Sequence, residues 1–92
     1  MQAEKAIEKY LCRQIIMRDG LCVKLTGVNG IPDRICLMPG AKFAFAELKA
    51  PGGRISPVQE ARHRQLKKMG YEVAVLWNYD QVDDFLKEIS NE

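Results

Sequence analysis

The stretch KFAFAELKAPGG, residues 42–53, decides the fold of this chain. Residues 42–49 read as an interior strand, and a Pro-Gly-Gly loop ends it. Successive strand side chains point to opposite faces of a sheet, so Glu47 and Lys49 share one face while Leu48 points to the other. A buried strand that ends in a carboxylate and an ammonium group is costly unless the charges are paired. These two charges therefore need either a partner or a function.

A second strand is expected over residues 33–38, and Pro39-Gly40 would join it to the first as a hairpin. Asp33 and Glu47 then lie far from the turn, on adjacent strands about 4.8 Å apart. Two carboxylates that converge at one sheet edge repel each other unless a cation lies between them. The pair therefore predicts oxygen ligands for a hard divalent ion such as Mg²⁺.

The lysine of the same stretch is placed to assist chemistry at such an ion. Lys49 would lie about 6.6 Å beyond Glu47 on the same face, within reach of a metal-held water or a scissile phosphate. The loop that follows leaves its backbone open to close approach, and Arg54 can meet a phosphate there. The alternative interpretation is a plain ion pair between Glu47 and Lys49 at a strand end.

The remaining elements follow from hydrophobic periodicity and end signals. We expect an amphipathic helix over 2–18, a strand over 21–26, a helix from the N-cap Ser56 to Gly70, a strand over 71–77 and a helix over 81–89. The predicted order is α-β-β-β-α-β-α, an α/β fold with a mixed sheet flanked by helices. One domain would span residues 1–92, without internal repeats.

The composition is that of an ordinary globular protein, with 47% hydrophobic and 28% charged residues. Its apolar runs are far shorter than the roughly 20 residues of a membrane-spanning helix, and the N-terminus lacks the apolar region of a secretory signal. We therefore expect a cytoplasmic protein with no membrane partner. A chain this short buries only about 60 to 65% of its unfolded surface, so a partner subunit would help to stabilise it.

The cysteines and the histidine give no metal pattern. Cys12, Cys22 and Cys36 are scattered in the sequence without a C-x-x-C pair, and His63 is the only histidine. This excludes a zinc site and a disulfide framework, and the cysteines read as small buried hydrophobes of a reducing compartment. His63 reads as a surface residue with no ligand or base partner.

Three short motifs resemble a known family. G-I-P-D at 30–33, E-L-K at 47–49 and S-P-V-Q at 56–59 resemble the virus-type replication-repair nuclease (VRR-NUC) domain of the PD-(D/E)xK nuclease superfamily, in its small stand-alone phage form. The resemblance covers nearly the whole chain, because α-β-β-β-α-β is also the order of the superfamily core. It implies an endonuclease that hydrolyses phosphodiester bonds of DNA with Mg²⁺ or Mn²⁺.

The resemblance also implies roles for the residues of the motifs. Asp33 and Glu47 match the metal-binding acids, and the main-chain carbonyl of Leu48 is a candidate third ligand. Lys49 matches the catalytic lysine. Gln59 matches the glutamine that positions the lysine or the attacking water, although it also stands where a capping box needs a glutamine.

Members of the superfamily often add a glutamate from the first helix. Glu4 is the candidate, and Glu8 competes with it one helical turn further on, since spacing alone does not separate them. Solvated helix charges are the alternative interpretation of both.

Basic residues would hold the nucleic acid. Arg54, Arg62, Arg64, Lys67 and Lys68 gather in the loop and the second helix. With Lys24 they would contact phosphates of branched or double-stranded DNA without reading sequence. A solvated helix face is the alternative for Lys67 and Lys68, and an exposed strand lysine is the alternative for Lys24.

A chain of this length has no room for a separate DNA-recognition domain, so shape selectivity would come from a symmetric dimer with two active sites. By analogy with stand-alone members, we expect a homodimeric Holliday-junction resolvase in the cytoplasm of a bacterial host if the chain is phage-encoded. A flap or general nuclease of the same family and a catalytically idle DNA-binding module are the alternatives. The final strand and the C-terminal helix are candidates for the interface.

Overall fold

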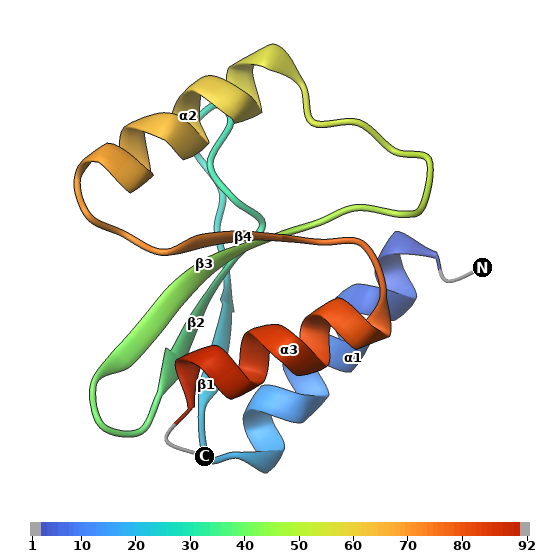
Figure 1. Cartoon of the computed structure of the whole chain (residues 1–92), viewed down its shortest axis with the longest axis vertical. Helices are drawn as coiled ribbons and strands as arrows, with labels where there is room; N and C mark the ends of the chain where they lie inside the picture. The colour runs from blue at the N-terminus through green and yellow to red at the C-terminus, as the bar shows by residue number, and fades with distance from the viewer. Residues whose placement is uncertain (1–2, 91–92) are drawn as a thin grey trace.

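The computed structural model describes residues 3–90. Its elements are α1 (Glu4–Met17), β1 (Leu21–Lys24), β2 (Arg34–Met38), β3 (Lys42–Leu48), α2 (Pro57–Lys68), β4 (Val73–Leu76) and α3 (Tyr79–Ile89) (Figure 1). The predicted α/β class and the order α-β-β-β-α-β-α are confirmed. The start expected for the first helix, residue 2, lies outside the described residues.

Several element boundaries differ from expectation. β4 begins at Val73, two residues later than expected, and two further boundaries differ for local reasons. β1 ends at Lys24, two residues early, and only one further backbone bond, from Leu25 N–H to the Asp33 carbonyl, continues its pairing. α3 begins at Tyr79, two residues early, because the Asn78 side chain accepts a hydrogen bond from the backbone N–H of Gln81. Asn78 is thus the N-cap of α3. Asparagine is a favoured residue at this position, but our prediction did not include it.

The sheet has the strand order β1-β2-β3-β4, with the first three strands antiparallel and β4 parallel to β3. The predicted hairpin is present, with Met38 paired to Lys42 across the turn. Gly40 has a φ of 83° in this turn, a conformation that glycine adopts without steric cost. The hairpin fixes the register that sets which side chains of β2 and β3 face each other.

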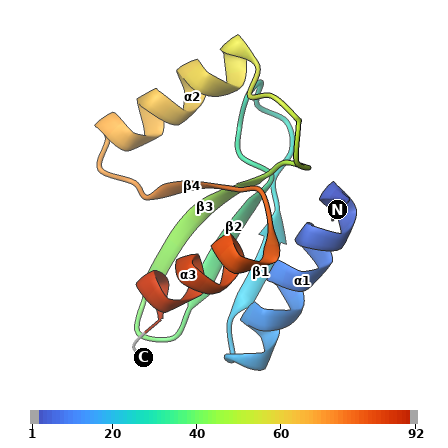
Figure 2. The same cartoon turned by 45° about the vertical axis from the view of Figure 1, so that its right-hand side comes forward.

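Helices cover both faces of the sheet. α1 and α3 lie together on one face and α2 crosses the other face, as Figures 1 and 2 show from two directions. The main core lies between the sheet and the helices α1 and α3. It consists of apolar side chains from both layers: Ile7, Leu11, Ile15, Cys36, Met38, Ala44, Ala46, Leu48, Leu76, Val82, Phe85, Leu86 and Ile89. Burial of this apolar surface is the main stabilising contribution to the fold.

An aromatic pair and a hydrogen bond join α1 to α3. The rings of Tyr10 and Tyr79 stack with their centroids 4.4 Å apart, and the Tyr10 hydroxyl donates a hydrogen bond of 2.6 Å to Asp83. Such a pair adds about 0.5 to 1.5 kcal/mol to the burial of its surface. The position of α1, which carries Glu4 and Glu8, therefore depends on contacts with the end of the chain.

The start of α2 is a complete capping box, as predicted. The Ser56 hydroxyl accepts from the backbone N–H of Gln59 at 3.2 Å, and the Gln59 side-chain oxygen accepts from the backbone N–H of Ser56 at 3.0 Å. Pro57 occupies the first helical position, where its missing N–H costs nothing. The first turn of α2 is thereby fixed, together with the side chain of Gln59.

The cysteines are scattered in the sequence, but the fold brings them together. Cys22 and Cys36 are cross-strand partners, and the Sγ atoms of Cys12 and Cys22 lie 2.8 Å apart. Burial, with the neighbouring Cys22 thiol, raises the pKa of Cys12 to about 12. All three thiols are free, and only Cys36 is fully buried, so the prediction of buried hydrophobes is too strong for the other two.

Part of the second sheet face stays open beyond α2. The side chains of Leu21, Leu37 and Phe43 are neighbours in the strand register, and the Tyr71 ring lies 5.9 Å from that of Phe43. All four are exposed, and we call them the open sheet face. In contrast, the apolar residues Val82, Phe85, Leu86 and Ile89 of α3 are buried within this chain. No helix within residues 3–90 has the length and apolar character to cross a membrane.

Candidate active site

β2 and β3 bring Asp33 and Glu47 to the same end of the sheet. The register pairs Arg34 with Ala46, so the preceding Asp33 stands opposite Glu47. Asp33 Oδ2 accepts a hydrogen bond of 2.8 Å from the backbone N–H of Leu48. The convergence of two carboxylates that the hairpin predicted is present.

The same hydrogen bond orients the main chain of Leu48. The N–H and C=O of one strand residue point to the same side of the strand, because antiparallel partners exchange both bonds. Since the Leu48 N–H points at Asp33, its carbonyl oxygen is directed to that side too. The main-chain oxygen of Leu48 is thus available beside the two carboxylates.

Glu47 is a buried carboxyl group, only 1% exposed. Burial, together with the hydrogen bond and charge of Asp33, raises its pKa to about 8, and the nearby Lys49 opposes this rise. Its Oε1 atom has no hydrogen-bond partner within residues 3–90. An acid that is buried beside a second acid is stabilised when a cation joins them.

Two side chains contact the other oxygen of Glu47. Gln59 Nε2 donates to Glu47 Oε2 at 3.3 Å, and Lys49 Nζ lies 3.9 Å from the same oxygen. Gln59 therefore caps α2 with its oxygen, as expected, and reaches Glu47 with its nitrogen, a contact that was not predicted. The ion pair with Lys49, our alternative interpretation, is present as a long contact.

The prediction for His63 is wrong, because the residue is only 6% exposed and its Nε2 lies 3.4 Å from Glu47 Oε1. Gln59, His63 and Leu66 follow each other at four- and three-residue spacings, so they share the face of α2 that packs on the sheet. That spacing was readable in the sequence. Burial lowers the pKa of His63, as do the nearby charges of Lys67 and Lys49, while Asp33 acts in the opposite direction.

The loop before Asp33 is fixed against α2. A Cβ atom on Gly30, whose φ is 75°, would lie 2.9 Å from the carbonyl carbon of Val58 and closer still to its oxygen. Arg62 Nε donates to the Asn29 carbonyl at 2.9 Å. The predicted DNA contact Arg62 therefore also has a structural contact, which no spacing in the sequence indicated.

The two candidate glutamates of α1 have different surroundings. Glu8 Oε2 accepts from Arg34 Nε at 2.8 Å and from Lys24 Nζ at 3.4 Å. Burial opposes ionisation of Glu8, but these cations hold its pKa below the ordinary value. Glu4 is exposed, and its charge contributes to the raised pKa of Glu47. Glu8 is thus engaged with Arg34 and the predicted DNA contact Lys24, whereas the charge of Glu4 acts on Glu47.

The donor atoms fit a small hard cation. Residues 3–90 contain no group of three or more His, Cys, Asp or Glu side chains placed to hold a metal ion. The candidate donors at this point are two carboxylates and a main-chain oxygen. Mg²⁺ is commonly held by one or two carboxylates and takes water or phosphate oxygens for the rest. The buried pair of Asp33 and Glu47 suits such an ion.

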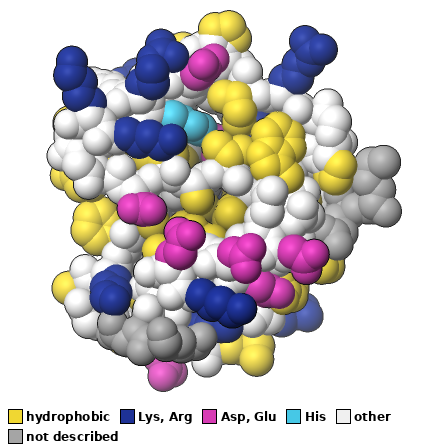
Figure 3. Space-filling model, viewed as in Figure 1, with side chains coloured by type: hydrophobic (Ala, Val, Ile, Leu, Met, Phe, Trp, Pro, Cys, Tyr) yellow, Lys and Arg dark blue, Asp and Glu magenta, His cyan; other side chains and the backbone are white. Residues whose placement is uncertain are grey.

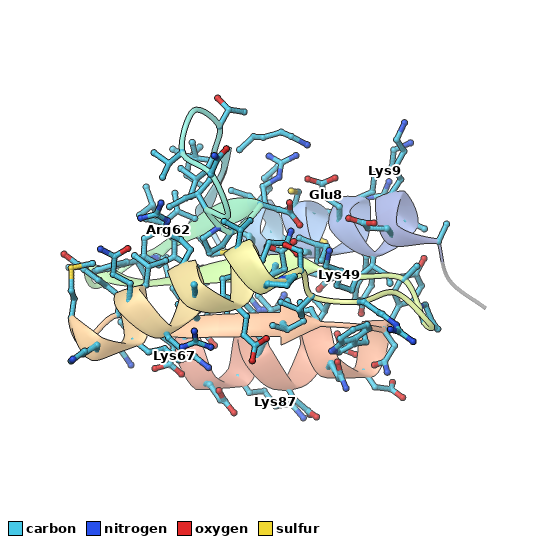
Figure 4. All side chains as sticks on the ribbon, turned by 90° about the horizontal axis from the view of Figure 1, so that it is seen from above. Glu8, Lys9, Lys49, Arg62, Lys67 and Lys87 are labelled. Carbon is cyan, nitrogen blue, oxygen red and sulfur yellow. The ribbon has the colours of Figure 1, made fainter. Side chains whose placement is uncertain are left out.

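Positive charge lies around α2 and negative charge over α3. Figure 3 shows Lys and Arg side chains about α2 and acidic side chains along α3. Arg54, Lys67 and Lys68 are exposed in the loop and the last turn of α2, and Figure 4 shows Lys49 between α1 and α2. A hollow of about 430 Å³ beside α2 is lined by Ile55, Glu60, His63, Arg64, Lys67 and Val75. The α2 side is therefore the electrostatically favourable side for a polyanion.

Comparisons with known proteins agree with these motifs. A family model described as "VRR-NUC domain" matches residues 6–77. "Putative nuclease p44" of Acyrthosiphon pisum secondary endosymbiont phage 1 is 37% identical over 79 residues, which cover 84% of this chain and 85% of that protein. A solved structure described as "VRR_NUC domain" superposes with a TM-score of 0.84 at 26% identity and covers 95% of this chain and 97% of the other. The resemblance found in the sequence is therefore confirmed, and this chain belongs to the VRR-NUC family of nuclease domains.

Proposed function

We propose that this chain is a metal-dependent endonuclease that hydrolyses phosphodiester bonds of DNA and acts as a single domain. The observation that carries the proposal is the meeting of Asp33 and Glu47 beside Lys49 at one end of the sheet, in a chain of a nuclease-domain family. A catalytically idle DNA-binding module is the second candidate. It has no use for a buried pair of acids, which costs free energy without a cation.

In this proposal Asp33, Glu47 and the main-chain carbonyl of Leu48 hold Mg²⁺ or Mn²⁺, with Glu4 as a further acid at the rim. Two observations support this assignment of ligands, namely the short hydrogen bond between Asp33 and the Leu48 backbone and the raised pKa of Glu47. When bound, the ion polarises the phosphoryl oxygen and stabilises the leaving oxygen.

Lys49 directs its ammonium group to the attacking water and offsets the negative charge that develops on the phosphate. Its support is its position 3.9 Å from Glu47 Oε2, where it can reach a group held by the acids. Gln59 fixes the Glu47 side chain and the water. The water adds to phosphorus as the P–O bond to the leaving oxygen breaks, and by analogy with the superfamily the products carry 5′-phosphate and 3′-hydroxyl ends.

Phosphate contacts position the DNA without reading its bases. Arg54, Lys67 and Lys68 are exposed on the α2 side, Arg62 adds charge from α2 itself, and Lys24 adds charge from β1, beside Glu8 of α1. Such contacts release counterions, so binding weakens steeply as the salt concentration rises.

We further propose that two copies form a homodimer and that the dimer resolves Holliday junctions. The open sheet face supports the dimer, because adjacent exposed apolar side chains on one face are typical of a protein contact. A symmetric dimer holds two active sites at a fixed separation, which suits the paired nicks that a four-way junction needs. Cutting of flaps or of general DNA by the same centre is the alternative.

The test is cleavage of end-labelled four-way junction, flap and linear duplex DNA in Mg²⁺ or Mn²⁺, with the Lys49→Ala variant beside the wild type. We expect paired symmetric nicks in the junction, and a loss of about 10²-fold or more in rate for the variant. Cutting of flaps or duplex instead retains the chemistry and rejects the resolvase. No cutting with either metal favours the idle binding module.

A further inference from the structure

We infer that His63 is a positioning residue of the candidate active site, which holds Oε1 of Glu47 by donating a hydrogen bond from Nε2 and thereby orients the carboxylate toward Asp33. The inference rests on the proposed function, since the oriented carboxylate matters as a metal ligand. It assigns a task to the only histidine of the chain, which the motifs of the family resemblance do not include.

The two atoms concerned face each other in a buried place. His63 Nε2 lies 3.4 Å from Glu47 Oε1, and the two side chains are 8% and 1% exposed. Within residues 3–90 neither atom has any other hydrogen-bond partner. Buried polar atoms are rarely left unpaired, so two unpaired atoms at this separation point to a hydrogen bond between them that needs only a small adjustment.

With the His63 contact, both oxygens of the Glu47 carboxylate have a side-chain partner on α2. Gln59 Nε2 donates to Oε2 of Glu47, and His63, four residues later on the same face of α2, reaches Oε1. The Gln59 side chain is itself locked, because its oxygen caps the helix at Ser56. With both oxygens held, the carboxylate keeps one orientation relative to Asp33.

The position of His63 suits holding the ligand rather than the ion. Its ring contacts Glu47, and His63 is also among the residues that line the hollow beside α2. A partner that hydrogen-bonds a metal ligand fixes its orientation, and loss of such a partner typically weakens metal binding about 10- to 100-fold. A ring that only fills space has no such effect.

The test compares three variants at this position. His63→Gln places an amide nitrogen about where Nε2 lies, His63→Asn places it about where Nδ1 lies, and His63→Leu has no donor. Lys87→Gln on the exposed side of α3 is the control, since Figure 4 places it away from Lys49. The measurements are Mn²⁺ affinity by titration calorimetry and the metal concentration that gives half-maximal cleavage, with circular dichroism to confirm folding.

We expect His63→Leu and His63→Asn to bind Mn²⁺ about 10- to 100-fold more weakly than the wild type, and His63→Gln to recover most of the loss. Cleavage by the weak variants should recover at high metal concentration. Affinity equal to wild type in His63→Asn, or equal losses in His63→Gln and His63→Asn, overturns the inference. If His63→Leu does not fold, the Gln and Asn pair decides the question.

A measurement without metal separates this inference from the proposed function. Because the chain has one histidine, nitrogen NMR resolves its two ring nitrogens without ambiguity. Above the pKa of Glu47 we expect the proton on Nε2 in the wild type and a change of its shift in Glu47→Gln. A proton on Nδ1 contradicts the inference even if the protein cuts DNA. If the wild-type protein binds no Mn²⁺ and cuts no DNA but carries the proton on Nε2, the proposed nuclease function is rejected while the His63–Glu47 contact is retained.

Discussion

Glu47 is the residue on which the candidate site depends. Its carboxylate is contacted by side chains from separate parts of the chain, namely Asp33 before β2, Lys49 after β3, and Gln59 and His63 on α2. Three of these neighbours are cations or hydrogen-bond donors, and one, Asp33, is an acid. Burial beside that acid makes the ionised form of Glu47 costly. A cation at this point removes that cost and lowers the pKa of Glu47 again.

At the same scale, the raised pKa of Glu47 predicts how stability changes with pH. In the metal-free protein Glu47 titrates at about 8, and in the unfolded chain a glutamate titrates at about 4.3. Between these values the folded state binds the extra proton, so its contribution to stability is complete below about pH 4.3 and is lost as the pH rises toward about 8. Glu47→Gln should abolish this loss.

Urea unfolding of both metal-free proteins across this range is the measurement. The lowered pKa of His63 changes stability with pH in the opposite direction. Because His63 is present in both proteins, the difference between their profiles reports on Glu47. Parallel stability profiles for the wild type and Glu47→Gln would contradict the buried acid pair.

At the scale of the elements, α2 and the loop before β2 assemble the site as one unit. Gly30 lets the loop approach the Val58 carbonyl, and Arg62 fastens Asn29 to the helix. The capping box fixes the first turn of the same helix. A disturbance of this contact therefore moves Asp33 relative to Glu47, although neither residue is changed.

Gly30→Ala tests the contact between loop and helix, and Gly27→Ala is its matched control. Both glycines have a positive φ, which costs a non-glycine residue about 1 kcal/mol, but a Cβ on Gly27 meets no atom within 4 Å. Gly30→Ala should lower the free energy of unfolding by clearly more than the control and should also weaken Mn²⁺ binding. Equal losses in urea unfolding for the two variants would show that the loop does not rest on α2.

The hairpin elements show how far the sequence could lead. The strands, the Pro39-Gly40 turn and the meeting of Asp33 with Glu47 were predictable, because they follow from alternation and a short turn within one continuous segment. The capping box was predictable for the same reason. The contacts of His63, of Arg62 and of the three cysteines join segments that are distant in the sequence, and the docking of α2 and α1 on the sheet decides them.

At the scale of the whole molecule, different faces carry basic, acidic and exposed apolar side chains. Basic side chains surround α2 beside the candidate site, acidic side chains lie over α3, and the open sheet face presents exposed apolar residues. In the proposed homodimer, DNA would bind on the α2 side and the second copy would contact the open sheet face. The two partners would therefore use different surfaces.

Phe43→Lys tests the dimer, and Lys42→Glu is the control from the opposite face of β3. A buried charge in an apolar interface costs several kcal/mol, so Phe43→Lys should be monomeric in sedimentation equilibrium where the wild type and Lys42→Glu are dimeric. Paired nicks in the junction should become single nicks in the same variant. A monomeric wild type, or a dimeric Phe43→Lys, would reject the open sheet face as the interface.

The central claim, that Asp33 and Glu47 form a metal-dependent nuclease centre, is tested most directly by cleavage of end-labelled four-way junction DNA with and without Mn²⁺, using wild type and Asp33→Asn. The account predicts cutting by the wild type that requires the ion and stops when it is chelated, and almost none by the folded variant. Cutting that persists in Asp33→Asn, or that does not require a divalent ion, would contradict the account.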